Sequence, residues 1–298
     1  MYSFILRRFI GGLVVVFFVI TSTFFMLRLL PGGPFDKEKK LPEEIKLNIE
    51  KKYHLDKPLF QQYLLYLSGI IRGDFGPSYK FLHRTATDII RDVFPVSLRI
   101  GFISFIVSLF LGILIGFSSA GSKIFESFFS LVISLPSFVF ASVMIIILSL
   151  KLGIFPPALI EGWKHYILPV LTLSLGPMIY IAKLTKTSVE KTLKEQFIVF
   201  AKSKGVYGYN FFKHVLYPSL SSVFSISGMI FTFLITGSFI VETIFAIPGM
   251  GRYFVLSVID RDYPVVMALT VVFTVVLVIM NVFSEIIYSL FDPRARER

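Results

Sequence analysis

Cysteine is absent from this 298-residue chain, and charged residues are scarce at 16% of the sequence. The lack of cysteine excludes a disulfide framework and a thiolate-ligated metal site. Charge is scarce beside a hydrophobic content of 55%, a balance far outside the average of soluble globular domains. The composition therefore predicts an integral membrane protein.

Groups of residues that carry out catalysis are missing as well. The histidines are scattered over polar segments on opposite sides of the predicted membrane, so they cannot form one metal site: His54, His83, His165 and His214. The sequence has no glycine-rich phosphate loop ending in Gly-Lys-Ser/Thr, and its apolar runs lack the acid–base pair of an ion-driven carrier. We expect no enzymatic activity, metal or cofactor in this chain, so a partner must supply the energy for any transport.

Long apolar runs dominate what is present. A helix of about 20 apolar residues crosses a hydrocarbon core of roughly 30 Å. Six runs predict an all-α protein with six transmembrane helices, at 9–29, 99–119, 128–150, 167–184, 219–241 and 265–287. The predicted organisation is 1–30 with the first helix, an extracytoplasmic segment 31–98, a core of five helices at 99–287 and a tail at 288–298.

The net charge of +11 is concentrated on one side of the predicted membrane. Arg7 and Arg8 precede the first run, residues 183–217 carry seven Lys/Arg against two Glu, and the tail adds further arginines. An excess of Lys and Arg marks cytoplasmic loops. We therefore expect both termini and the 185–218 loop in the cytoplasm, and the charge requires no nucleic-acid partner.

Short amphipathic helices are predicted in the extracytoplasmic segment. One begins near Pro42, which suits a first helical turn, and a second covers 60–67. Arg28 lies near the far end of the first run, where a long side chain reaches the membrane interface.

Several residues inside the runs have a predicted structural role. Pro136 interrupts helical hydrogen bonding, whereas Gly112 and Gly116 predict close packing between helices more than a substrate contact. Glu285 lies near the cytoplasmic end of the last run, which favours an interfacial carboxylate over a proton relay.

The 185–218 loop is too long for a simple connection between packed helices. Residues Phe197, Phe200, Ala201 and Lys204 recur at helical spacing, and Gly205 follows them as a helix terminator. The pattern predicts a short surface helix, a glycine break and a second helix that enters the membrane at Pro218. From the residues alone, docking onto a partner and passive adsorption to the membrane surface are both compatible with this helix.

This loop resembles the cytoplasmic loop of permease subunits of binding-protein-dependent ABC importers. Their signature is Glu-Ala-Ala, three residues, Gly, nine residues, an aliphatic, any residue, Leu and Pro. Here Ala201 is followed after three residues by Gly205, and after nine more by Val215, Leu216, Tyr217 and Pro218. Val199 and Phe200 replace the Glu-Ala pair and Tyr217 replaces Leu, departures that are usual in the peptide and nickel importer branch.

The resemblance to that branch extends over nearly the whole chain. It includes Leu30-Pro31-Gly32-Gly33-Pro34, the Asp74 turn in Arg72-Gly73-Asp74-Phe75-Gly76, and Leu135-Pro136-Ser137-Phe138. It continues through Glu242-Thr243-Ile244-Phe245, Pro248-Gly249-Met250-Gly251 and Asp260-Arg261-Asp262-Tyr263-Pro264. The order of these fragments is most similar to the first of the two permeases in oligopeptide or dipeptide importers.

The resemblance implies the type I ABC importer permease fold in a bacterial or archaeal cytoplasmic membrane. It also implies a second permease subunit, two cytoplasmic ATPases that hold ATP and Mg, and an extracytoplasmic solute-binding protein. Peptide is the implied cargo; nickel, glutathione or another small solute is the alternative.

Two sites follow from this reading. Phe197, Phe200 and Ala201 are predicted to contact an ATPase groove, with Gly205 permitting the turn. On the outer side, a short re-entrant gate is one interpretation and a plain surface loop the other, for the segment that holds Glu242, Pro248, Gly249, Gly251 and Arg252.

Overall fold

The computed structural model describes residues 2–29, 55–81, 83–236 and 239–291. Regular structure within these ranges is helical, apart from an isolated β-bridge between Pro77 and Thr85. The α-helices are α1 (Tyr2–Leu29), α3 (Leu59–Ile71), α4 (Ala86–Ser118), α5 (Ile124–Ser134), α6 (Ser137–Met144), α7 (Ile167–Thr192), α8 (Gln196–Ser203), α9 (Gly208–Thr236), α10 (Phe239–Ile244), α11 (Met250–Ile259) and α12 (Tyr263–Phe291). A π-helix, η1 (Ile145–Lys151), follows α6, and a 3₁₀ helix, η2 (Trp163–Tyr166), precedes α7.

Five continuous stretches of helix are long and apolar enough to cross a membrane: Arg7–Leu29, Ala86–Ser118, Trp163–Thr192, Gly208–Ile244 and Tyr263–Ile286. A sixth crossing exists if the bent pair Ile124–Ser134 and Ser137–Lys151 is counted as one span. The six-helix, all-α prediction is thus confirmed at the level of five or six spans.

The span predicted at 128–150 is wrong as a continuous helix. Its two halves, α5 and the joined α6 and η1, meet at an angle of 91°. Leu135 has an extended ψ of 121°, as expected of a residue before proline, and Pro136 has no N–H to continue the helical ladder. Pro136 therefore ends one helix and starts the next in a new direction.

The span predicted at 99–119 begins earlier than expected. Helix α4 starts at Ala86, so its first three turns lie in the segment assigned to 31–98. Its start is fixed by a capping box, in which the Thr85 side chain accepts from the Asp88 N–H and the Asp88 carboxylate accepts from the Thr85 N–H. The first amphipathic helix predicted, near Pro42, lies outside the described residues.

Close helix packing at the small residues is confirmed. A Cβ on Gly112 would lie 2.8 Å from Ile181, and one on Gly116 would lie 2.5 Å from the Ala182 carbonyl oxygen. These clashes show that α4 and α7 approach almost to backbone contact. Gly228 plays the same part between α9 and α12, where a Cβ would lie 2.3 Å from the Met280 carbonyl oxygen.

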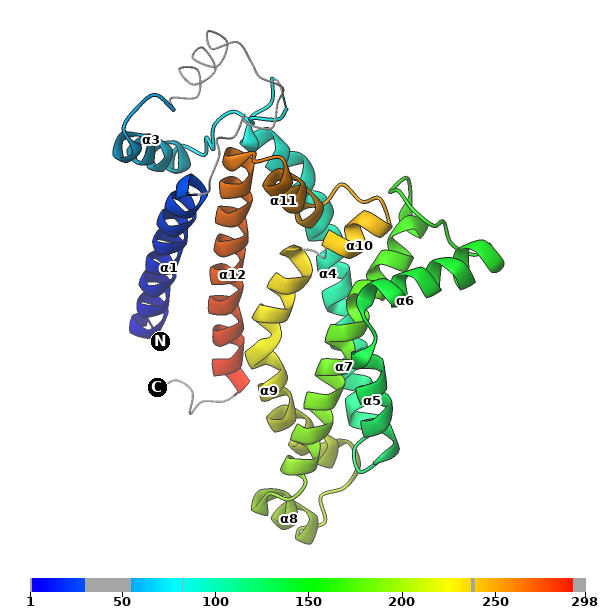
Figure 1. Ribbon diagram of the computed structural model, residues 1–298. Coiled ribbons are helices and arrows are strands. Elements are labelled where there is room, and N and C mark those ends of the chain that lie inside the picture. The colour runs from blue at the N-terminus through cyan, green and yellow to red at the C-terminus, as the bar shows by residue number, and fades with distance from the viewer. Residues whose placement is uncertain (1, 30–54, 82, 237–238, 292–298) are drawn as a thin grey trace.

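The two ends of the molecule differ (Figure 1). The first turn of α1, the last turn of α12 and helix α8 lie toward one end, whereas α3 and α11 lie at the other. At the first end Glu285 pairs with Arg8 at 2.9 Å, which agrees with an interfacial carboxylate. At the second end α3 lies across the end of α1, and its bounds include the amphipathic helix predicted at 60–67.

Candidate functional site

The polar loop between α7 and α9 contains the predicted surface helix, α8 (Gln196–Ser203). Ile198 anchors it, because this side chain is fully buried in a cluster with Val189 of α7 and Val215 of α9. After α8, Gly205 adopts a left-handed φ of +76°, and the Val206 N–H donates to the Ala201 carbonyl oxygen at 3.1 Å. The helix is thus firmly attached to the two long helices that flank it.

The opposite side of α8 is apolar and exposed. Phe197 is 46% exposed, and Val199 and Phe200 are each 58% exposed. We call these three residues the α8 apolar face; together with Gln196 and Ser203 they line a shallow surface hollow. Lys204 lies over the Phe200 ring with its Nζ 4.4 Å from the ring centroid. Exposed apolar clusters of this kind are typical of surfaces that bind a partner.

The structure divides the predicted loop residues into two groups. Phe197, Phe200 and Lys204 face outward, whereas Ala201 is 8% exposed and Val215 is 3% exposed. Helix α8 turns Ala201 toward the chain's own interior, so the contact of this residue with an ATPase groove stays a prediction. Leu216 is partly buried, and Pro218 lies exposed within α9, which begins ten residues earlier at Gly208.

Val199 was not among the predicted contact residues. From the sequence, Val199 is interpreted only as a departure from the family signature. Its aliphatic side chain between Phe197 and Phe200 is the signal that could have identified it. Only the position of Ile198 in the core shows which way the helix is rotated, and this rotation places Val199 outward.

The candidate outer gate consists of two short helices, α10 and α11, joined by the turn around Pro248. Glu242 is 3% exposed, so this segment differs from a plain surface loop. Its carboxylate accepts a hydrogen bond from the Arg252 N–H at 2.7 Å and from the Ser97 hydroxyl at 3.2 Å. Glu242 therefore links α10 to the first turn of α11 and to α4.

Glycine is required at the turn between α10 and α11. A Cβ on Gly249 would lie 2.5 Å from the Glu242 carboxylate, and a Cβ on Gly251 would lie 3.1 Å from both the Phe239 N and the Thr236 carbonyl oxygen. Pro248 itself is exposed. Of the five predicted gate residues, three surround the buried carboxylate: Gly249, Gly251 and Arg252.

The family-motif residue Asp262 fastens the segment before α4 to the turn between α11 and α12. It is 1% exposed and accepts from the Ser78 hydroxyl, the Tyr79 N–H at 3.1 Å and the Lys80 N–H at 3.4 Å. The neighbouring Asp260 pairs with the Lys80 ammonium at 3.6 Å.

The other two motif residues shape turns. Arg261 has a left-handed φ of +57°, which bends the chain between α11 and α12. The Asp74 carboxylate accepts from the Gly76 N–H at 2.9 Å. A Cβ on Gly69 would lie 2.5 Å from the Asp74 carbonyl oxygen, so this turn is held tightly against α3. Together the four motif residues organise the connections at the end of the molecule that holds α3 and α11.

Among the described residues, no three His, Asp or Glu side chains are grouped to hold a metal ion. The described arrangement offers an exposed apolar helix at one end and a linked pair of short helices at the other.

Comparison with known proteins connects these features to one family. Residues 108–297 match the family model described as "Binding-protein-dependent transport system inner membrane component", and residues 1–101 match the corresponding N-terminal model. The chain is 38% identical to the oligopeptide transport system permease protein OppB of Haemophilus influenzae, over 99% of this chain and 100% of the relative. It is 37% identical to the dipeptide transport system permease protein DppB of Bacillus subtilis, over 99% of this chain and 98% of the relative.

Proposed function

The chain belongs to the inner membrane components of binding-protein-dependent transport systems, and on this premise we propose that it is the pore-forming permease of an importer for oligopeptides or dipeptides. The peptide assignment is supported by relatives named as oligopeptide and dipeptide permeases that are 36–38% identical over 99% of the chain. The names of these relatives favour peptide over nickel, glutathione or another small solute as the cargo.

The importer we propose has further subunits. A second permease completes the pore, two cytoplasmic ATPases bind ATP and Mg, and an extracytoplasmic binding protein delivers the cargo. The need for separate ATPases is supported by the sequence, which carries no phosphate-binding loop.

The orientation we propose places both termini and α8 in the cytoplasm of a bacterial or archaeal cell. It is supported by the Lys/Arg excess of residues 183–217 and by the location of α8 at the same end as the start of α1 and the finish of α12 (Figure 1). Helices α3 and α11 then lie on the extracytoplasmic side, where the binding protein docks.

The coupling role rests on a single observation: α8 exposes Phe197, Val199 and Phe200 while Ile198 anchors it between α7 and α9. A helix held in this way transmits displacement of its outer face to both long helices. In Figure 1, α8 lies beyond the first turn of α1 and the last turn of α12. This position favours docking in a groove of an ATPase over adsorption to the membrane surface. Closure of the ATPases on ATP moves α8, and the membrane helices then switch between inward-open and outward-open states.

The outer segment from Glu242 to Arg252 acts as a gate in this scheme. Its two short helices are joined to α4 through one buried carboxylate, so they shift as a unit when α4 moves.

The test is uptake of a labelled peptide panel, with nickel included, into proteoliposomes that hold this chain with its partner permease, ATPases and binding protein. We expect uptake that requires ATP and depends on peptide length. Uptake of nickel alone would overturn the cargo, and uptake without ATP would overturn the importer mechanism.

A further inference from the structure

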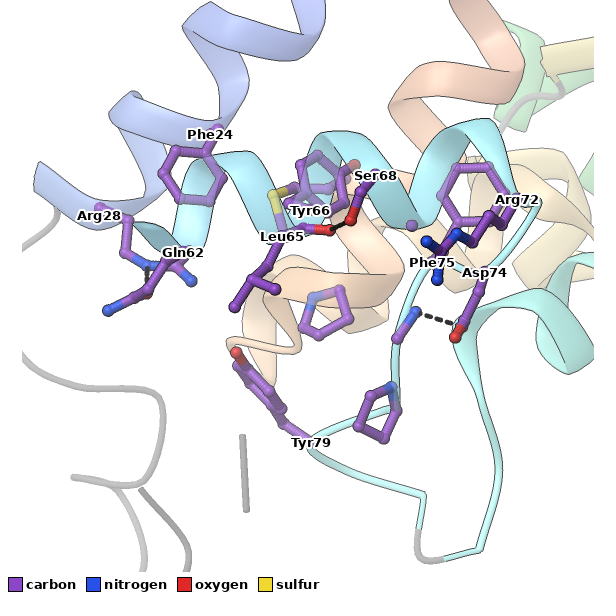
Figure 2. Close-up of a pocket in the computed structure, with 15 residues that line it drawn as sticks. Phe24, Arg28, Gln62, Leu65, Tyr66, Ser68, Arg72, Asp74, Phe75 and Tyr79 are labelled. Atoms are coloured by element: carbon purple, nitrogen blue, oxygen red, sulfur yellow. Dashed lines mark hydrogen bonds between the residues drawn. The ribbon is translucent and has the colours of Figure 1, made fainter. Parts of the chain in front are cut away.

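A pocket of about 350 Å³ lies at the junction of α1, α3, the segment around residues 72–79 and the start of α12 (Figure 2). Arg28 and Gln62 are together at one end of this pocket, and Arg72 and Asp74 are at the other. We call it the Arg28 pocket. It lies away from α8, at the end of the molecule that holds α3 and α11.

The guanidinium of Arg28 is incompletely satisfied. Its Nε donates to the Gln62 side-chain oxygen at 3.0 Å, and its Cζ lies 4.5 Å from the centroid of the Phe24 ring. Its Nη1 is buried and has no hydrogen-bond partner. In the described part of the chain no carboxylate lies within ion-pair distance of Arg28. A buried, unpaired donor on a cation is costly, so this geometry calls for an anion.

A second unpaired donor lies in the same pocket. The Tyr66 hydroxyl is buried and has no hydrogen-bond partner. Burial raises the pKa of this phenol, and the positive charge of Arg28 opposes that shift only in part. Tyr66 therefore keeps its proton and can donate a hydrogen bond.

The one carboxylate among the described lining residues does not fill this need. Asp74 lies at the far end of the pocket from Arg28, beside Arg72 (Figure 2). Its carboxylate already accepts from the Gly76 N–H at 2.9 Å.

The surroundings of the pocket are those of a membrane interface. Arg28 lies in the last turn of the membrane-spanning helix α1, and the adjacent Leu29 is 81% exposed. Helix α3 lies across this end of α1 and exposes apolar side chains such as Phe60 and Leu64. Helices that lie in the interface bury such residues in the headgroup and acyl boundary, the depth at which lipid phosphates are found.

We propose that the Arg28 pocket binds the phosphate group of a membrane phospholipid, with Arg28 and Tyr66 as hydrogen-bond donors. The glycerol and acyl chains follow the exposed apolar surface next to the pocket, at Leu29 of α1 and Leu65 of α3. The bound lipid holds α3 against α1, next to the existing hydrogen bond between Thr21 and Tyr63 at 2.7 Å. This inference is independent of the cargo.

The test is native mass spectrometry of the full transporter complex, purified in detergent and supplied with phosphatidylglycerol. We expect one phospholipid retained per copy of this chain, and about tenfold weaker retention in Arg28→Gln, which loses a charge-assisted contact. Tyr66→Phe keeps the ring and weakens retention less. Arg28→Lys keeps the charge but loses the planar donor fork, so it falls between the wild type and Arg28→Gln.

Arg91→Gln is the matched control. It removes the same charge from an exposed position near the start of α4, outside the pocket, and it should retain lipid like the wild type. Equal retention in Arg28→Gln and the wild type would overturn the site. A titration with inorganic phosphate distinguishes a lipid headgroup from free phosphate as the ligand. If free phosphate binds as tightly as a short-chain phosphatidylglycerol, the assignment to lipid is overturned. Circular dichroism of each variant verifies that the helices are retained.

Discussion

Ser97 of α4 and Glu242 of α10 share a hydrogen bond of 3.2 Å, although 145 residues separate them in the chain. The Ser97 oxygen also accepts from the Met250 N–H at 2.7 Å, so one hydroxyl joins α4, α10 and α11. Both side chains are buried, at 1% and 3% exposure. A satisfied polar network in an apolar interior fixes the relative positions of the elements that it joins.

The first prediction is that Ser97 and Glu242 are energetically coupled. Ser97→Ala and Glu242→Gln should each lower the free energy of unfolding by about 1–3 kcal/mol, because each leaves a buried polar group unpaired. The double variant should lose less than the sum of the two, with a coupling of about 0.5–3 kcal/mol. Thermal unfolding of the purified chain, followed by circular dichroism, measures all three variants. Strict additivity would mean that the two residues act independently.

Gly249→Ala tests the turn that encloses the carboxylate. The added methyl would lie 2.5 Å from Glu242 Oε1, so the carboxylate must move away from its donors. We expect a loss of about 1–3 kcal/mol from overpacking, together with impaired peptide uptake. Gly162→Ala is the control, since its Cβ would meet only His165 Nδ1 at 4.0 Å and its φ of −169° is open to any residue. Similar unfolding midpoints for the two variants would contradict the crowding described here.

The two aspartates of the α11–α12 turn should differ sharply in their contribution to stability. Asp262→Asn replaces one acceptor oxygen by an amide in a buried site with three donors, and should cost about 1–3 kcal/mol. Asp260→Asn removes only a partly exposed ion pair with Lys80 and should cost less than about 1 kcal/mol. The measurement is the same thermal unfolding. Raising the salt concentration should further reduce the small effect at Asp260.

The parts of the fold that were predictable are those encoded in local sequence. Apolar length predicted the spans, and the helical spacing from Phe197 to Lys204, followed by Gly205, predicted α8. Pro136 predicted an interruption of the helix but not the 91° bend, because tertiary packing sets the angle. The inward rotation of Ala201 and the link between Ser97 and Glu242 depend on contacts between distant segments, which no local pattern contains.

The α8 apolar face yields a prediction about assembly. Phe200→Ala removes a ring that is 58% exposed, so it should leave the permease folded while weakening its association with the ATPases by about 2 kcal/mol, roughly thirtyfold. Phe128→Ala in α5 removes the same side chain at 52% exposure, away from α8, and should associate normally. Titration of the permease pair with labelled ATPase measures both. Equal affinities would show that the ATPases dock elsewhere.

Gly205→Asp separates backbone strain from partner contact. Gly205 has a φ of +76° and no atom within 4 Å of an added Cβ, so inside the chain the substitution costs only the left-handed strain of about 1–2 kcal/mol. Gly153, between η1 and η2, has a φ of +62° and equally open space, so Gly153→Asp carries the same strain away from α8. We expect both variants to insert and to pair with the proposed second permease. ATP-driven peptide uptake should be lost only in Gly205→Asp, because the aspartate would project into the proposed ATPase contact. Normal uptake by assembled Gly205→Asp would place the turn after α8 outside that contact, and equal loss in both variants would attribute the defect to backbone strain.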